Sequence, residues 1–264
     1  MICTGATTCG YFFPGDQRLL YSSTHGSGPN CPPKPKRDGA YRWALDDYDI
    51  YSVGINGQEM QRLTSTPGYD AEATVSPDGK TIVWTSVKDG DLDLYTMNLD
   101  GSKPRRLTTA IGYDGGAFFS PDSQRIVYRA SHPTDPVEID RYKELLSQGL
   151  VEPGQLEVFV MNADGSGQRP ITSNGASNFS PYYFPDGKRI IFSSNIETKG
   201  EGGRPSFHLY AIGEDGQGLE RLTFDGHFNS FPMFSPDGTK LVWVSDRSAK
   251  APGEFNVFLA DWVP

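Results

Sequence analysis

Short apolar runs alternate with polar turns along the chain, and the same order of runs returns five times. Each copy has an apolar stretch, a proline turn and an alternating stretch, as in TVSPDGKTIVWTS at residues 74–86. Alternation of apolar and polar residues predicts β-strands. The Asp-Gly of the turn predicts a hairpin, because glycine tolerates the positive φ of tight turns. The prolines of this turn lie at positions 14, 77, 121, 185 and 236.

A second hairpin signal follows the first in four of the copies. Its sequences are YDIYSVGINGQEMQRLT (48–64), LDLYTMNLDGSKPRRLT (92–108), LEVFVMNADGSGQRPIT (156–172) and FHLYAIGEDGQGLERLT (207–223). Each copy therefore predicts four antiparallel strands, which we call strands a to d. Four-stranded units repeated every 44–64 residues, measured between the prolines, are typical of a β-propeller.

The number of blades stays open between five and six. The fifth copy ends as FNVFLADWVP, before a strand d, and residues 1–4 (MICT) match the RRLT of that strand. These residues would close a ring of five blades with both ends of the chain, whereas a blade upstream would make six. We predict a single all-β domain over residues 1–264: a β-propeller of four-stranded antiparallel blades, five of them visible, with one helical insertion.

The irregular segments fall at one end of the strands, because strand direction alternates within each blade. The largest are residues 24–48 and 131–154, both between strands b and c. The second predicts the one helix of the chain, with an apolar stripe of Ile139, Tyr142, Leu145 and Leu146. Its boundary signals are Asp135 as N-cap, Pro136 at the first turn, Glu138 two residues later and Gly149 after the end. Loops on a rigid scaffold commonly bind ligands, so we expect the function at this loop end.

Composition narrows the classes of function. The chain of 264 residues has a net charge of −9 and 36% hydrophobic residues, which suits a globular protein. An acidic chain without a basic stripe argues against nucleic acid as a partner. No apolar run approaches the ~20 residues that span a bilayer, so we expect no membrane insertion, and the first residues show no secretory signal.

The repeated pattern SPDGK-x-I-x-F-x-S followed by LY-x-M-x-x-DG and RLT resembles the WD40-like repeat of TolB-type β-propellers. The resemblance covers nearly the whole chain and is weakest at Pro14-Gly15-Asp16 and at Ser123, where the usual Asp-Gly is altered. TolB-like propellers have six blades. The resemblance implies a periplasmic or exported protein and says little about activity.

Oxygen-bearing side chains recur at the start of strand a, eight residues before the Asp of the turn. They are Asp70, Asp114, Asn178 and Asn229, and Glu72 lies two residues after the first of them. If the innermost strands ring a channel, these oxygens converge at its mouth and would suit Ca²⁺ or Mg²⁺ as the bound ion. The alternative is that Asp and Asn cap their own loops as Asx-turns. Beside them, Tyr69, Tyr113 and Phe228 would supply contact area for a partner.

Histidines offer a different metal site. His25 and His132 follow strand b in the first and third copies, and His227 precedes strand a in the fifth, so all three belong to the loop end. They would suit a transition metal. Oligogalacturonate lyases, relatives of the same propeller type, are similar in using a histidine-bound metal. The alternative is that the three are scattered loop residues, since no local ligand spacing supports a site.

The chain has three cysteines, so one of them is left over if two form a disulfide. Cys9 and Cys31 belong to the same copy and the same end, so a disulfide between them would staple the long loop, with Cys3 as a competing partner. A reduced compartment is the alternative. There is no Gly-x-Ser-x-Gly elbow and no phosphate-binding glycine loop.

We therefore expect a non-catalytic propeller that binds a protein or small ligand at the loop end, with Ca²⁺ as a candidate ion. The alternative is a metal-dependent lyase or hydrolase on the same fold. A third reading is a module of a larger propeller-peptidase. Oligomeric state is not indicated by the sequence.

Overall fold

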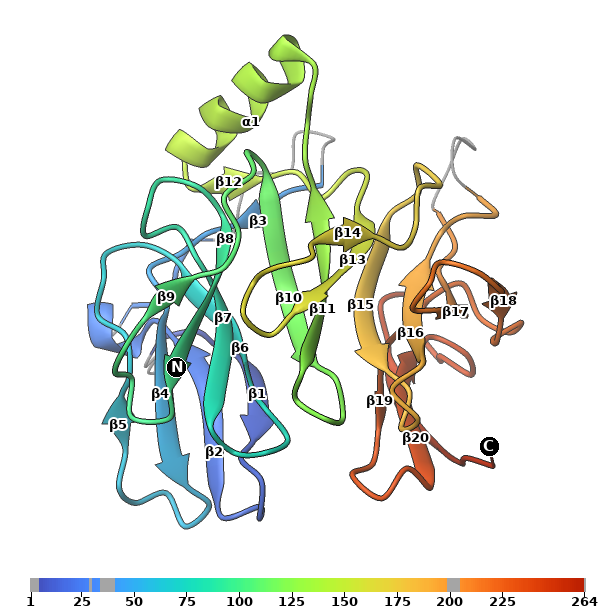
Figure 1. The fold of residues 1–264 in the computed structure, drawn as a ribbon, viewed down its shortest axis with the longest axis horizontal. Helices are drawn as coiled ribbons and strands as arrows, with labels where there is room; N and C mark the ends of the chain where they lie inside the picture. Colours follow the sequence, from blue (N-terminus) through green and yellow to red (C-terminus); the bar gives the residue numbers. More distant parts are fainter. Residues whose placement is uncertain (1–4, 29, 34–40, 199–204, 264) are drawn as a thin grey trace. The chain divides into compact units, whose positions relative to one another are not determined.

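A computed structural model describes residues 5–28, 30–33, 41–198 and 205–263 of the chain (Figure 1). It is built of successive antiparallel sheets with one α-helix. The chain divides into two compact units. The first unit is residues 1–117 with 130–153, and the second is residues 118–129 with 154–264.

The first unit holds two complete sheets. The first sheet has the order β1-β2-β4-β5, with β1 Thr7–Phe12, β2 Arg18–Ser23, β4 Asp49–Gly54 and β5 Gln61–Arg62. The second has the order β6-β7-β8-β9, with β6 Asp70–Val75, β7 Thr81–Ser86, β8 Asp93–Asn98 and β9 Arg105–Arg106. A short 3₁₀ helix, His25–Ser27, follows β2.

Three further sheets follow. The third has the order β10-β11-β13-β14, with β10 Tyr113–Phe119, β11 Arg125–Ser131, β13 Glu157–Asn162 and β14 Arg169–Pro170. The fourth has the order β15-β16-β17-β18, with β15 Asn178–Tyr183, β16 Arg189–Ser194, β17 His208–Gly213 and β18 Glu220–Arg221. The fifth is β19-β20-β21, with β19 Asn229–Phe234, β20 Lys240–Ser245 and β21 Asn256–Asp261.

This architecture confirms the predicted all-β propeller of five blades with one helix. Within the described ranges the fifth sheet has three strands. The fourth strand predicted for it, residues 1–4, lies outside the described residues. The prediction of a single domain over 1–264 stays a prediction.

The proline turns of the second, third and fifth sheets close by the same side-chain contact, from a serine to an aspartate two residues later. In the turn between β6 and β7, Ser76 Oγ donates to Asp78 Oδ1 at 2.7 Å, and the same Oδ1 accepts from the Lys80 amide at 3.2 Å. The residue after the aspartate takes a positive φ, 68° at Gly79 and 61° at Ser123. These turns therefore specify the hairpins locally, and Ser123 adopts a conformation that favours glycine.

The first strand of four sheets carries a β-bulge that the alternating pattern does not predict, and the first strand of the third sheet has a positive-φ residue at the same place. The strand register shifts between Ala71 and Thr74 in β6, and equivalent shifts occur in β1, β15 and β19. One residue in each strand has a φ of 52–60°; these residues are Cys9, Glu72, Gly116, Ser180 and Phe231. A bulge re-aims the side chains on either side of it, so strict alternation fails along these strands.

Apolar side chains fill the spaces between neighbouring sheets. In the first unit, Leu20 and Ile50 of the first sheet pack with Ile82 and Trp84 of the second. In the second unit, Ile191 and Leu209 of the fourth sheet pack with Phe234 and other residues of the fifth. Each sheet therefore buries both faces only when it has a neighbour on each side.

The insertion at 131–154 forms the predicted helix, α1, at Pro136–Ser147, and a short strand β12, Leu150–Val151. Asp135 Oδ1 accepts from the amides of Val137 and Glu138 at 2.8 and 3.3 Å, which confirms the predicted N-cap. The strand β12 pairs with β3, Trp43–Ala44, from the other insertion. Part of that insertion, residues 29 and 34–40, lies outside the described residues.

Candidate functional site

The two insertions of the first unit meet above a group of buried polar side chains at the loop end of the second and third sheets. At the centre, His132 Nε2 lies 2.9 Å from Asp114 Oδ1, and the Asp114 side chain is fully buried. The hydroxyl of Tyr142, on α1, donates to Asp91 Oδ1 at 2.5 Å and to the carbonyl of Gly112 at 2.9 Å. Tyr142 thus ties the helix to the loops of this group.

The second insertion is held by salt bridges as well as by strand pairing. Glu152 accepts from Arg42 Nε at 2.8 Å and from Arg141 on α1 at 2.7 Å. The amide of Leu45 donates to the carbonyl of Gly149 at 2.7 Å. The helix, β12 and β3 therefore form one platform, whose position is fixed by contacts at several points. We call residues 41–45 and 135–152 the insertion platform.

Burial and neighbouring carboxylates shift the titration of the group beneath the platform. Burial raises the pKa of Asp114, and the hydrogen bond from His132 offsets this only in part. Burial alone would lower the pKa of His132, but the hydrogen bond and the charge of Asp114 outweigh it and raise that pKa. Burial also raises the pKa of Asp93 to about 6, although Arg106 opposes this shift. Asp93 therefore changes its charge in the mildly acidic range.

The four residues predicted at the start of strand a are all buried inside their own sheets. Asp70 accepts from Trp84 Nε1 at 3.0 Å and from Thr66 at 2.7 Å, and Asn178 accepts from Ser194 at 2.6 Å. Asn229 donates to the carbonyl of Asp225 at 2.9 Å. These contacts are those of side chains that brace the loops entering each blade, as in the Asx-turn alternative.

Glu72 differs from those four, because its bulge directs it toward the next strand. Its Oε2 accepts from Thr85 and Tyr113 at 3.1 Å and from the amide of Gly116 at 3.0 Å. A Cβ on Gly115 would lie 2.6 Å from this oxygen, so glycine is required beside it. Three donors on one carboxylate oxygen fix the position of the Glu72 side chain between the second and third sheets.

The structure does not gather the predicted calcium ligands into one site within a unit. Calcium takes six to eight oxygen ligands. Asp114 Oδ2 and Asn229 Oδ1 are each buried without a hydrogen-bond partner, but they lie in different units. Among the described residues, no three His, Cys, Asp or Glu side chains lie together as metal ligands would. Calcium binding stays a prediction.

The three predicted histidines have three different surroundings. The ring of His25 lies 4.2 Å from the ring of Tyr51, and His132 contacts Asp114. His227 Nδ1 lies 3.2 Å from Ser206 Oγ in the second unit. A transition-metal site formed by these histidines stays a prediction.

The predicted contact aromatics are not equally available. Tyr113 is 4% exposed, so the expectation that it offers contact area is wrong: Trp43 packs edge-on to its ring, with 5.8 Å between centroids, and its hydroxyl donates to Glu72. Tyr69 and Phe228 are half-buried. Phe228 packs against Phe179 and Phe255. Contact with a partner by these two stays a prediction.

The predicted Cys9–Cys31 disulfide is not formed. Cys9 is an exposed thiol on β1, and Cys31 is disulfide-bonded. The bulge at Cys9 re-aims its side chain, which sequence spacing could not show. The third cysteine, Cys3, lies outside the described residues.

Sequence reasoning missed Asp91, Arg42 and Glu152, which complete the site. Asp91 sits in a short loop between β7 and β8 that resembles any polar turn. Arg42 and Glu152 lie 110 positions apart in the sequence. Only Tyr142 carried a signal, as the one aromatic residue in the apolar stripe of the helix with a hydroxyl able to reach a buried acceptor.

Family models match two overlapping parts of the chain. Residues 142–261 match the TolB beta propeller domain, and residues 45–158 match the Tricorn protease N-terminal beta propeller domain. The structure of TolB from Acinetobacter baumannii superposes with a TM-score of 0.63 at 19% identity, covering 97% of this chain and 66% of that chain. A putative TolB from Agrobacterium tumefaciens gives 0.57 at 20% identity, covering 98% and 91%. The chain therefore shares the β-propeller fold of the TolB proteins, and its sequence is similar to two families of propeller domains over these segments.

Curated relatives match shorter segments. An uncharacterized protein of Agrobacterium fabrum is 29% identical over 89 residues, which are 34% of this chain and 28% of that protein. Dipeptidyl-peptidase 5 of Porphyromonas endodontalis is 31% identical over 99 residues, 37% of this chain and 13% of the peptidase. The matches thus span a small part of both relatives. Among the described residues, no helix has the length and apolar character needed to cross a membrane.

Proposed function

We propose that this protein is a non-catalytic binding propeller and that the insertion platform of the first unit docks a protein partner. The observation that carries this proposal is the unusual state of α1. The helix is fixed by an N-cap, by Tyr142 and by Glu152, yet none of its residues is buried. A helix that is held in place without joining the core is preorganised, and preorganisation lowers the entropic cost of binding.

Exposed apolar and aromatic side chains on the platform support the same function. Val137 is 75% exposed at the first turn of α1, and Tyr41 is 74% exposed beside β3. The ring of Tyr41 lies edge-on to Trp43, with 6.4 Å between ring centroids. Aromatic residues are enriched in protein interfaces, where they supply area with few rotatable bonds. A periplasmic or exported location, which the resemblance to TolB favours, belongs to this proposal.

A paired pull-down tests the proposal. The native chain is immobilised and exposed to an envelope extract of the source organism, and bound proteins are identified by mass spectrometry. Val137→Asp should reduce recovery of the partner at least tenfold, because a charge at the docking surface would be desolvated. Val257→Asp is the matched control, since Val257 is 73% exposed on β21 in the second unit. Equal recovery by both variants, or equal loss in both, would contradict the proposal.

The similarity to Dipeptidyl-peptidase 5 favours a second candidate, a propeller that serves a peptidase within a longer chain. The mass of the protein purified from its source, together with a dipeptide-release assay on that material, tests it. A mass near 29.0 kDa and no dipeptide release would exclude this second candidate.

A further inference from the structure

The repeats provide an internal comparison for one position between neighbouring sheets. The residue directly after strand c is Leu99 in the second sheet and Trp262 in the fifth. Leu99 packs against the apolar core between the first two sheets. Trp262 packs on Phe184 and Phe234, with ring centroids 5.5 and 5.2 Å away. In both places a large apolar side chain closes the space between two sheets.

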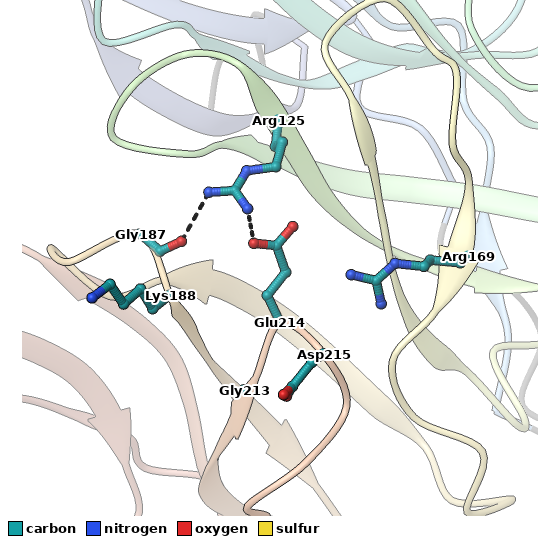
Figure 2. A pocket seen from close by; sticks show the side chains of 7 residues that line it. All are labelled: Arg125, Arg169, Gly187, Lys188, Gly213, Glu214 and Asp215. Carbon is teal, nitrogen blue, oxygen red and sulfur yellow. Dashed lines mark hydrogen bonds and ion pairs between the residues drawn. The ribbon is translucent and has the colours of Figure 1, made fainter.

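The fourth sheet has Glu214 at this position, and the space between the third and fourth sheets is closed differently. Phe13 and Phe184 precede the turn proline in the first and fourth sheets, whereas the third sheet has Ser120 there. The two large apolar side chains that fill this space between other sheets are thus replaced by Glu214 and Ser120. A cavity of about 460 Å³ lies here, entirely within the second unit and at the turn end of the strands (Figure 2). It is separate from the insertion platform, so this inference goes beyond the proposed function.

One wall of the cavity is fixed by Arg125. Its guanidinium forms a salt bridge with Glu214 and donates to the carbonyl of Gly187 at 3.1 Å, as the dashed lines in Figure 2 show. The guanidinium also lies 5.9 Å from the centre of the Tyr183 ring. Glu214 is therefore held at the centre of the cavity, with its negative charge partly compensated. Asp215 adds a second carboxylate at the rim.

The opposite wall carries Arg169, which extends from β14 toward Glu214 in Figure 2. In the other four-stranded sheets the last residue of strand d is an arginine that pairs with a carboxylate: Arg62 with Asp49, Arg106 with Asp93 and Arg221 with Glu197. The third sheet has Pro170 at that place, and its arginine stands one residue earlier. Among the described residues, Arg169 makes no ion pair. Lys188 adds another positive charge at the edge of the cavity.

We propose that this cavity binds a small zwitterion, a free amino acid or a dipeptide, through its carboxylate and ammonium groups. A carboxylate would take the two parallel hydrogen bonds of the Arg169 guanidinium, with Lys188 adding attraction. Glu214 and Asp215 would face the ammonium group. The lining carries three cations and two carboxylates, so a ligand with both signs matches it better than a simple anion. The volume falls within the range of small-molecule sites.

Calorimetric titration with alanyl-alanine tests the assignment. The native protein should bind the dipeptide saturably, and Arg169→Ala should weaken the affinity at least tenfold. Arg105→Ala is the matched control, because Arg105 is exposed at the same strand-d position of the second sheet and should leave the affinity unchanged. Absence of saturable binding, or an equal loss in both variants, would overturn the proposal.

Two blocked dipeptides separate the charges. N-acetyl-alanyl-alanine lacks the ammonium group and alanyl-alanine amide lacks the carboxylate, and each should bind at least fivefold more weakly. If the acetylated peptide binds as tightly as the zwitterion, the site recognises an anion only and the assignment is wrong. Glu214→Leu should fill the space with an apolar side chain, as Leu99 does in the second sheet, and should abolish binding. The circular dichroism spectrum of this variant checks that it folds. Arg169→Ala, a surface change, tests binding at the cavity independently.

Discussion

The two units bury different side chains at the same position of the repeat. At the start of strand a the first unit has the carboxylates Asp70 and Asp114, and the second has the amides Asn178 and Asn229, all of them nearly or fully buried. Asp70 and Asp114 accept from a tryptophan, a threonine and a histidine. Asn178 also donates, to the carbonyl of Leu156 at 2.9 Å and to Glu157 at 3.0 Å.

The comparison shows two solutions to one requirement. The chain entering the second to fifth blades is braced by a buried polar side chain, and an amide does this without carrying a charge into the interior. A carboxylate needs donors around it and stays sensitive to protonation. We therefore expect the first unit, which also carries the insertion platform, to respond to pH more strongly than the second.

Exchanging an amide for a carboxylate at the start of strand a should have the largest effect on stability. Asn178→Asp replaces a donor with a charge that faces the Leu156 carbonyl, Glu157 and Asn174, so we expect a loss of about 4–5 kcal/mol at neutral pH. Urea unfolding measures it, and the loss should shrink as the pH falls toward 4. The conservative Asp70→Asn in the first unit is the control. A cost below about 1 kcal/mol for Asn178→Asp would mean that the position tolerates either group.

The second-largest effect should come from removing an arginine, which should cost more stability in the first unit than in the second. Arg106 lies 2.5 Å from Asp93, whose side chain is fully buried. Arg106→Ala leaves this carboxylate with only the hydrogen bond from the Thr108 hydroxyl and should cost about 3 kcal/mol. Arg221→Ala in the second unit breaks a pair with the half-exposed Glu197 and should cost less than about 1 kcal/mol. Denaturant midpoints of both variants check this. Adding Asp93→Asn to Arg106→Ala should recover most of the loss, and failure to do so would assign the effect to packing.

The pH dependence of stability should be smaller and should come mainly from the first unit, because burial lowers the pKa of His208 in the second unit and acts there in the opposite direction. The pKa of His132 is raised in the folded state, so its contribution is fully present below its unfolded value of about 6.5 and is lost as the pH rises through the raised pKa. Asp93, with a pKa of about 6, acts in the same direction between about pH 4 and 6. Unfolding free energies from pH 5 to 9 should therefore fall with pH, and His132→Gln should remove the fall above pH 6.5. A steeper fall in the variant would refute the role of this pair.

The smallest effect concerns the hairpin turn between strands a and b of a blade. Ser123 has a φ of 61° where Gly79 has 68°, so Ser123→Gly should stabilise the protein by about 0.5–1 kcal/mol. The reverse change, Gly79→Ser, should destabilise it by a similar amount. Thermal melts of the two variants give the measurement, and equal signs for both would show that side-chain contacts outweigh backbone conformation.

Much of the fold could be predicted because its determinants are local. Ser76, Asp78 and Gly79 lie within four positions and close their own turn, and this arrangement recurs in later copies. The helix could be predicted for the same reason, since Asp135 caps the amides of residues two and three positions away. Such signals survive in a single sequence because they need no distant partner.

The candidate sites could be predicted only in part. Asp114 and His132 were each expected at the loop end, but as members of two different metal sites, and the structure joins them to each other. The Cys9–Cys31 pairing was wrong because the bulge in β1 re-aims Cys9, and the exposure of Tyr113 was wrong because Trp43, from a distant insertion, packs on its ring.

The sequence by itself determined the blades, their turns, the helix and the loop end, because these depend on residues a few positions apart. The tertiary structure alone decided that Arg42 meets Glu152 and that Tyr142 meets Asp91. It also decided that Glu214 lines a charged cavity, whereas Leu99 and Trp262 pack against apolar clusters. These contacts join residues 51 to 110 positions apart or depend on which side chains fill the space between two sheets. Packing of that kind is a property of the assembled sheets and is absent from any one repeat.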